Sequence, residues 1–181
     1  RLLRRHVSGR AEDVSVEREA RYAFVHEQIR QTLLSLLSTA RRQRLHLRMA
    51  DALERMRAVT IAQVHGYAVG GGLVLAAVCD LRVAAEDTVF SIPEVELGIP
   101  LAWGGIPRLV REIGPALTKE LVMTCRRFTP DEAKAAGFLN RVVPRAQLAA
   151  EVESLAARLL EMPSVPVTIT KEHVNSVARA M

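Results

Sequence analysis

The sequence predicts an α/β fold for residues 59–181, with a helical segment in front of it. Residues 59–64 form an apolar, β-branched run that is typical of a buried strand. Three glycines at 70–72 separate this run from an apolar stretch at 73–78, which predicts a helix, and residues 80–85 predict a second strand. Strand, glycine turn, helix and strand in this order indicate an α/β domain.

The helical segment in front covers residues 1–58. After a polar stretch at 6–19, apolar residues recur at helical spacing from about residue 21 to residue 37. Ser38 then predicts the N-cap of a second helix, because its hydroxyl can accept a free backbone N–H. The apolar stripe of that helix consists of Leu45, Met49, Leu53 and Met56. The two helices form a hairpin that must bury its stripes on another surface.

The net charge of +5 is concentrated in this first segment. Residues 1–58 contain 13 Lys and Arg against 7 Asp and Glu, whereas residues 59–181 contain 12 against 13. A basic arm suits nucleic acid or an acidic surface. It lacks the interleaved aromatic residues of single-strand binders, however, so we favour solvated, arginine-rich helix faces and expect no nucleic-acid partner.

Composition narrows the class of protein further. A chain of 181 residues, 49% of them hydrophobic, can bury a sizeable core. No apolar run approaches the roughly 20 residues that span a bilayer. Cys79 and Cys125 lie in apolar neighbourhoods without the spacing of metal ligands, which favours reduced thiols in a cytoplasmic protein and no metal site.

The glycine turn is the first candidate site. Glycines let the backbone approach a ligand closely, and the start of the following helix offers free N–H groups with a partial positive charge. The turn is therefore suited to an anion. Close packing of the helix on the strand explains the same glycines equally well, so the spacing alone leaves both interpretations open.

Five motifs follow one another between residues 60 and 171. They are residues 64–72 (V-H-G-Y-A-V-G-G-G), 79–80 (C-D), 93–100 (P-E-V-E-L-G-I-P), 104–109 (G-G-I-P-R-L) and 132–144 (E-A-K-A-A-G-F-L-N-R-V-V-P). In this order and at these separations they resemble the crotonase family of enoyl-CoA hydratases and isomerases. The resemblance implies a partial crotonase-like ββα spiral over residues 59–181, with the N-terminal half of the family domain absent.

The resemblance also implies a chemistry. Family members bind an acyl-CoA thioester as substrate, need no further cofactor, and hold the developing enolate oxygen with two backbone N–H groups. Gly71 corresponds to one of these donors and Glu94 to a catalytic glutamate, while the other donor belongs to the absent half. The implied substrate contacts are Ala68, Gly70, Val74, Ile99, Pro100, Trp103 and, near the CoA phosphates, Lys171. A homo-oligomer, trimer or hexamer, is also implied.

One position departs from the family pattern. The family carries a second glutamate two residues after the last glycine of the turn, and here that residue is Val74. Hydration needs both an acid and a base, whereas moving a double bond needs a single base. Glu94 alone therefore favours an isomerase, with a pKa raised by burial. Glu96 is a rival second acid, although we expect it to face solvent.

A second family resemblance falls on residues 22–55. The patterns F-x-H-x-x-I-R at 24–30 and R-R-x-x-L-H at 41–46 are similar to the helical region of bacterial LuxR-type signalling ATPases. No phosphate-binding G-x-x-x-x-G-K-[ST] loop occurs in the sequence, so no ATPase activity follows. This leaves an alternative function open, in which the chain is a non-catalytic remnant or fusion that serves as a protein-interaction scaffold.

Overall fold

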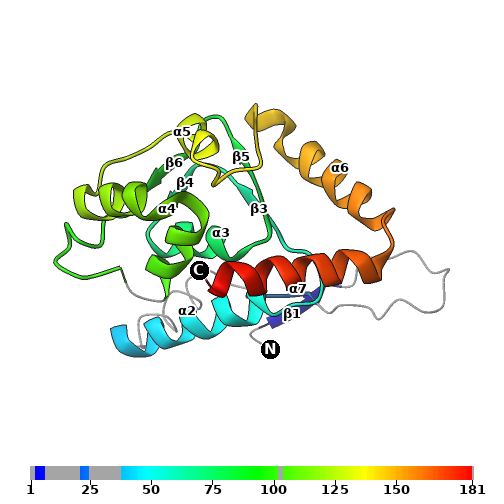
Figure 1. Cartoon of the computed structure of the whole chain (residues 1–181), viewed down its shortest axis with the longest axis horizontal. Coiled ribbons are helices and arrows are strands. Elements are labelled where there is room, and N and C mark those ends of the chain that lie inside the picture. Colours follow the sequence, from blue (N-terminus) through cyan, green and yellow to red (C-terminus); the bar gives the residue numbers. More distant parts are fainter. Residues whose placement is uncertain (1–2, 7–20, 25–37, 102–103, 181) are drawn as a thin grey trace. The chain divides into compact units, whose positions relative to one another are not determined.

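The structure, a computed structural model, describes residues 3–6, 21–24, 38–101 and 104–180 (Figure 1). The chain forms two compact units, Arg1–Arg42 and Gln43–Met181, each of which is described by itself. In the first unit β1 (Leu3–His6) pairs antiparallel with β2 (Arg21–Phe24).

This hairpin corrects the predicted helix at its beginning. Residues Arg21–Phe24 are extended, because their backbone groups are paired with β1 and not along a helix. Tyr22 and Phe24 are also residues that strands favour. The remainder of the predicted helix, residues 25–37, and most of the polar stretch at 6–19 lie outside the described residues.

The second predicted helix is present as α2 (Thr39–Glu54). The backbone N–H of Arg41 donates to Ser38 Oγ at 3.3 Å, which confirms Ser38 as the N-cap. Further along α2, Asp51 and Glu54 both accept from the guanidinium of Arg108, each at 2.9 Å. Arg108 lies on α4 (Gly105–Thr124), so this nearly buried cation holds the two helices together.

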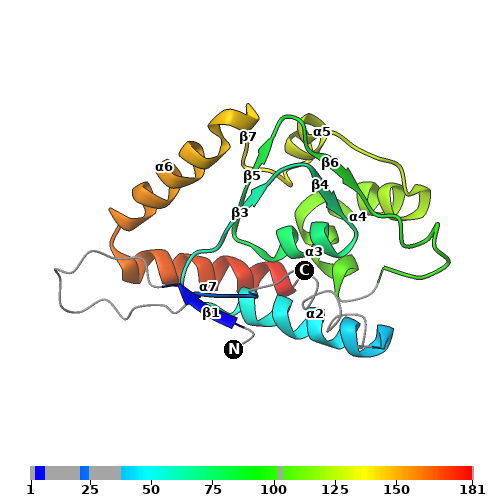
Figure 2. The same cartoon turned by 180° about the vertical axis from the view of Figure 1, so that it is seen from behind.

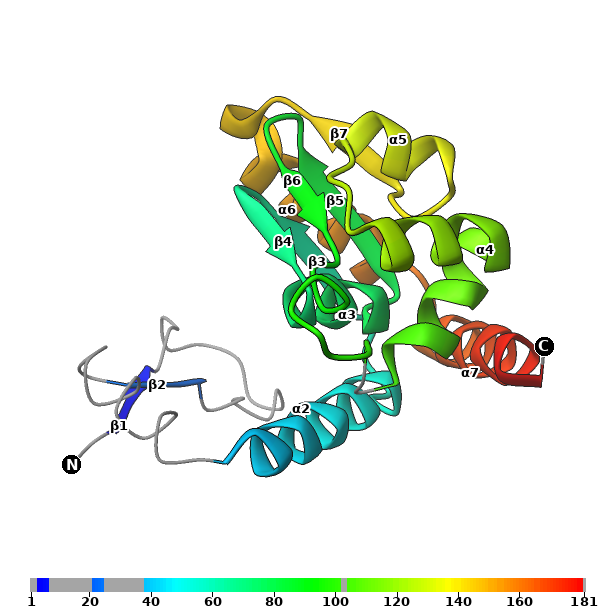
Figure 3. The same ribbon diagram turned by 90° about the vertical axis from the view of Figure 1, so that its left-hand side faces the viewer.

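Two small parallel sheets form the centre of the second unit (Figure 3). One has the order β3-β5-β7 and the other pairs β4 with β6. Their bounds are β3 (Ile61–Val64), β4 (Tyr67–Val69), β5 (Leu81–Ala85), β6 (Val89–Ser91) and β7 (Arg141–Val143). Gly66, with a φ of +67°, makes the turn that carries the chain from β3 of one sheet into β4 of the other.

Helices alternate with these strands along the chain and then follow the last strand. The glycine turn leads into α3 (Gly71–Val78), which then connects to β5. Beyond α4 come α5 (Pro130–Ala135), a 3₁₀ turn at Arg145–Gln147, α6 (Leu148–Leu160) and α7 (Ser164–Ala180) (Figure 2). These elements confirm the α/β class predicted from the sequence. None of the described helices has the length and apolar character required to cross a membrane.

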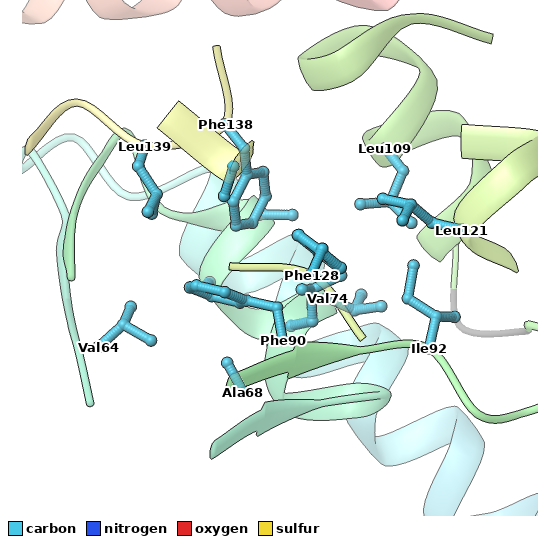
Figure 4. Packing of buried hydrophobic residues seen from close by; sticks show 14 of the residues in the cluster. Val64, Ala68, Val74, Phe90, Ile92, Leu109, Leu121, Phe128, Phe138 and Leu139 are labelled. Carbon is cyan, nitrogen blue, oxygen red and sulfur yellow. The ribbon is translucent and has the colours of Figure 1, made fainter. Parts of the chain in front are cut away.

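The side chains of the three-stranded sheet alternate between two cores. On one face Ala62, Val64 and Ala84 join the main core under α3 and α4. On the other face Ile61 and Val83 pack against α6, as the two-residue period of a strand requires. Figure 4 shows the main core, in which Phe90, Phe128 and Phe138 pack close together. Both faces of this sheet are thus covered.

A buried ion pair ties α7 to the strands. Lys171 Nζ lies 2.8 Å from Asp80 Oδ2 and also donates to the carbonyl of Ala58 at 2.8 Å. The same Asp80 oxygen accepts from the backbone N–H and the hydroxyl of Thr60, at 2.7 and 2.8 Å. Asp80 therefore joins α7, the start of β5 and the residue before β3.

We predict that Lys171→Met lowers the free energy of unfolding by roughly 2–4 kcal/mol, because it leaves the Asp80 carboxylate mostly buried and without its cation. Urea unfolding at neutral pH measures this loss. The matched control is Arg158→Met, which removes an exposed ion pair with Glu161 and should change stability by less than about 0.5 kcal/mol. Equal losses in the two variants would contradict the assignment.

Candidate functional site

The candidate site lies where β4 and β6 end. Because the two strands are parallel, the residues that follow them emerge at the same edge of the sheet. Gly70 follows β4, and the loop carrying Glu94 follows β6. The backbone N–H of Gly70 donates to the carbonyl of Ser91 at 3.0 Å, which fixes the two segments side by side. The glycine turn and the glutamate thus meet, as the family resemblance implies.

Gly70 approaches the Glu94 side chain very closely. It has φ +52° and ψ −117°, a conformation that L side chains rarely adopt. A β-carbon added to Gly70 would lie 2.5 Å from Glu94 Oε1. Only glycine therefore allows this carboxylate to sit against the turn.

The first turn of α3 presents backbone donors next to this carboxylate. The carbonyl of Gly70 accepts from the N–H of Val74 at 3.1 Å and so closes that turn. By helix geometry, the N–H groups of Gly71, Gly72 and Leu73 then have no acceptor within the helix. Donors at a helix start stabilise a developing oxyanion, which makes the N–H of Gly71 the candidate that the resemblance assigns.

Glu94 is a buried carboxyl group. Only 6% of the residue is exposed, and its Oε2 atom is buried and has no hydrogen-bond partner among the described residues. Desolvation by this burial raises the pKa of Glu94, an effect partly opposed by its own backbone N–H. The raised pKa agrees with the sequence-based prediction. A carboxyl group with a raised pKa is a stronger base than an ordinary glutamate, which suits it to taking up and returning a proton.

The loop that carries Glu94 is fixed by short-range hydrogen bonds. The N–H of Ile99 donates to the carbonyl of Glu94 at 3.0 Å, and the N–H of Leu97 donates to the carbonyls of Pro93 and Glu94. Glu96 is exposed on this loop, as the sequence predicts. An exposed Glu96 does not suit the role of a second acid in the site. Among the described residues, Glu94 is the one buried carboxyl group at this edge.

Val74 occupies the main core. It is 3% exposed, and a β-carbon on Gly105 would lie only 2.9 Å from Val74 Cγ2. Figure 4 shows Val74 among the buried apolar side chains near Phe90 and Phe128. Position 74 therefore packs α3 against the start of α4, whereas the family pattern has a carboxylate at this position.

The other predicted substrate contacts divide into four groups. Ala68 is buried in β4 directly before the turn and so lies with Gly70 and Glu94. Ile99 and Pro100 are exposed on the loop after Glu94. Trp103 lies outside the described residues. Lys171 differs from the prediction, because its ammonium is held by Asp80 and Ala58 and is not available to a phosphate.

Two neighbours of the site carry no signal in the sequence. Ser91 contributes only a backbone carbonyl, which the parallel pairing of β4 and β6 alone places beside Gly70. Cys125 Sγ accepts from the N–H of Glu96 at 3.3 Å, and this cysteine has a φ of +55°. Cys125 thus adopts the left-handed conformation that glycine favours.

Comparison with known proteins identifies the family. The family model described as enoyl-CoA hydratase/isomerase matches residues 29–181. The chain belongs to the enoyl-CoA hydratase/isomerase family, which confirms the partial crotonase-like fold predicted from the motifs. This match begins before residue 59 and includes α2, whereas the division at residue 59 and the resemblance of residues 22–55 to signalling ATPases stay predictions.

Individual relatives agree with this family. The crotonyl-CoA hydratase of Syntrophomonas wolfei is 41% identical over 123 residues, which cover 68% of this chain and 47% of that protein. The crystal structure of an enoyl-CoA hydratase subunit I from Geobacillus kaustophilus HTA426 has a TM-score of 0.73 at 36% identity, covering 82% of this chain and 58% of that one. A protein from Thermobifida fusca YX, described as an enoyl-CoA hydratase and solved in complex with CoA, has a TM-score of 0.70 at 30% identity, covering 86% and 58%. The chain spans about half the length of the curated relatives that it matches.

We predict that Gly70→Ala destabilises the protein more than Gly66→Ala does. Both glycines have positive φ, so both substitutions carry backbone strain, and the ψ of −117° places Gly70 outside the left-handed helical region that L residues can occupy. At Gly66 no atom lies within 4 Å of the added β-carbon, whereas at Gly70 it meets Glu94 Oε1. The difference between the two free energies of unfolding, measured in urea, reports this contact together with the difference in backbone strain between the two positions. Indistinguishable values would mean that Glu94 does not lie against the turn.

We also predict a pH-dependent contribution of Glu94 to stability. Because burial raises its pKa in the folded state, the protonated carboxyl is favoured by folding. The stability that it contributes is complete below the usual pKa of 4.5 and is lost as pH rises through the raised pKa. The glutamine of Glu94→Gln does not titrate. The free energy of unfolding of the wild type should therefore fall relative to that of the variant as pH rises above about 4.5. Parallel urea-unfolding curves for the two proteins across this range would contradict the burial of Glu94.

Proposed function

We propose that the chain acts on acyl-CoA thioesters through an enolate, with Glu94 as the single base and the Gly71 N–H as an oxyanion donor. The observation that carries this proposal is the position of the Glu94 carboxyl. It is buried, has one unpartnered oxygen and lies against the glycine turn that begins α3. Base and donor thus face one small region, which is the arrangement that enolate formation needs.

The reaction that suits one base is the shift of a double bond. The Glu94 carboxylate removes a proton from C2 of a 3-enoyl thioester, and the electron pair moves into the thioester carbonyl. The N–H of Gly71 stabilises the resulting oxyanion. The protonated Glu94 then returns the proton at C4, which moves the double bond from C3–C4 to C2–C3. Atoms and electrons balance without a second acid.

Val74 favours this isomerisation over hydration. Adding water across a double bond requires one group to activate water at C3 and another to protonate C2. Val74 is buried against the start of α4, and Glu96 faces solvent, so neither provides the second group. The names of the similar proteins describe hydratases, and the difference that we propose for this chain rests on position 74 alone.

The proposal also covers the substrate, the oligomeric state and the cellular location of the enzyme. CoA in the similar Thermobifida fusca structure supports a CoA thioester as the substrate. A cytoplasmic homo-oligomer, trimer or hexamer as in the family, is part of the same proposal.

A scaffold without catalysis is the second candidate. The observation that favours it is Val74, which places a buried apolar side chain where the family pattern has a carboxylate. The two candidates differ in ligand binding, because a ligand that binds only the folded state raises its melting temperature. An enzyme that recognises CoA thioesters should be stabilised by crotonyl-CoA or CoA, and a scaffold should not.

We predict that the chain converts a short trans-3-enoyl-CoA to its conjugated 2-enoyl isomer, measured as an increase in ultraviolet absorbance. Glu94→Gln should lower kcat by about 10²–10⁴, because an amide cannot accept the proton. The matched control is Glu96→Gln, two residues away on the same loop and exposed, which should leave the rate within about twofold.

Equal loss of activity in both variants would contradict the role of Glu94. Turnover that is faster for hydration of crotonyl-CoA than for isomerisation would overturn the single-base mechanism. A folded protein with neither activity nor stabilisation by CoA would favour the scaffold.

A further inference from the structure

A cavity of about 560 Å³ lies at the end of α3 that is opposite the candidate site. Its walls come mainly from the end of α3, the start of β5, residues 111–112 of α4 and one face of α7, all within the second unit. The last two residues of α3, Ala77 and Val78, line it, whereas Gly71 and Glu94 do not. Since α3 has eight residues and is about 12 Å long, the cavity is separate from the glycine turn.

The helix α7 presents one face to this cavity. Its lining positions recur every three or four residues along most of the helix, which is the spacing of a single helix face. They are Val167, Thr170, Lys171, Val174, Asn175 and Ala178. Val174 is 60% exposed although it lies on this face, so the cavity is open to solvent and a small molecule can enter it.

The Lys171 side chain sets the distance between α7 and the start of β5. Its ammonium reaches the Asp80 carboxylate and the carbonyl of Ala58, each at 2.8 Å. The four-carbon stem of the lysine therefore crosses the space between the helix and the strand, and its apolar surface faces that space. Ala77 on α3 and Ala178 on α7 are too small to fill the remainder. The cavity is thus a consequence of a long side chain flanked by short ones.

Every charged side chain in the lining is paired with another one from the lining. There are three of each sign, and they form the pairs Arg82–Glu112, Arg111–Glu54 at 3.2 Å and Lys171–Asp80 at 2.8 Å. The Cys79 thiol adds no charge, because burial raises its pKa. A charged ligand would lose its hydration in the cavity without finding a free counter-charge, which is unfavourable. The cavity therefore favours a neutral molecule.

The rest of the lining is mostly apolar, with a few uncharged polar groups. The apolar side chains include Val59, Val78, Leu159, Met162 and Val167. On α7, Thr170 adds a hydroxyl and Asn175 adds an amide, which offers both N–H donors and a carbonyl acceptor. Apolar walls with a small number of polar groups are typical of cavities that bind small molecules, and such cavities have volumes of about 300–1,000 Å³.

We propose that this cavity binds a neutral, mainly apolar small molecule with one polar group, held by the apolar walls and oriented by the amide of Asn175. An aromatic amine, alcohol or ketone has this chemistry, whereas a carboxylate, a phosphate or an ammonium compound does not. The cavity and the glycine turn lie at opposite ends of α3, so this binding site is distinct from the one proposed for the acyl-CoA thioester.

Two fluorescent probes that share one ring system test the preference for a neutral ligand. N-phenylnaphthylamine is neutral and carries one N–H group, and anilinonaphthalenesulfonate adds a sulfonate to the same rings. The fluorescence of both probes increases in apolar surroundings. We expect the full chain to bind the neutral probe saturably at one site and the sulfonate at least tenfold more weakly. Equal affinities, or no saturable binding of the neutral probe, would overturn the proposal.

Substitutions on α7 test the position of the neutral probe. Ala178→Phe fills part of the cavity and should lower the affinity at least tenfold. Ser176→Phe is the matched control, since it places the same side chain at an exposed position outside the lining and should change the affinity less than about twofold. Asn175→Leu keeps the size of the side chain but removes the amide, and should weaken binding roughly twofold to tenfold, the range of one hydrogen bond. Equal affinities of the two Phe variants would contradict the site, and an unchanged affinity of Asn175→Leu would contradict the orienting role.

Amide chemical shifts locate the neutral probe in the wild-type chain without any substitution. The amides of residues 77–82 and 167–178 should shift on titration, and those of residues 70–73 should not. Shifts centred on residues 70–73, or displacement of the probe by CoA, would place it at the glycine turn and overturn the proposal. A dimer that the probe converts to a monomer would identify a second copy as the occupant and would overturn it too. These measurements need no turnover, so they are independent of the role proposed for Glu94.

Discussion

The parallel pairing of β4 with β6 is the constraint on which the site depends. It places the ends of both strands at one edge, so that Gly70 reaches the carbonyl of Ser91 and the Glu94 carboxyl lies against the turn. That carboxyl is buried with an unpartnered oxygen, an arrangement that costs free energy. The packing around β6 opposes this cost, because Phe90 stacks on Phe128 at 5.3 Å and is paired with it through two backbone hydrogen bonds. The glutamate is thus held in place by its strand and not by a partner of its own.

The helix α3 connects the candidate site to the rest of the second unit. Its first residues are fixed by Gly70, and its other end is fixed by Arg82, whose guanidinium donates to the carbonyl of Cys79 at 2.7 Å. A cation at the C-terminal end of a helix also interacts favourably with the helix dipole. Arg82 further pairs with Glu112 of α4 and lies over the ring of Phe138 at 5.0 Å. The hydrogen bonds of Arg82 therefore hold the C-terminal end of α3 in place. The N-terminal end carries the backbone N–H groups that face the candidate site.

The sequence predicts what depends on short-range patterns. The N-cap at Ser38, the helix after the glycine run and the pairing of that run with Glu94 all follow from spacing and family motifs. Contacts between residues far apart in the chain are harder to predict from the sequence. The ion pair of Lys171 with Asp80 is an example, because the two residues are 91 positions apart and no local pattern links them. The extended residues Arg21–Phe24 are a similar case, since their pairing with Leu3–His6 competes with a helical pattern that is equally visible in the sequence. Sequence patterns therefore predict local elements better than they predict contacts between residues that are far apart in the chain.

Position 74 links the packing of α3 to its chemistry. Its side chain lies in the contact with Gly105 at the start of α4, where an added β-carbon would be within 3.0 Å of both Val74 and Leu101. A carboxylate in that contact would lose its hydration with no cation to replace it, which costs several kcal/mol. Valine instead adds apolar contact to the core. The close packing of α3 on α4 and the single-base mechanism proposed above thus depend on the same residue.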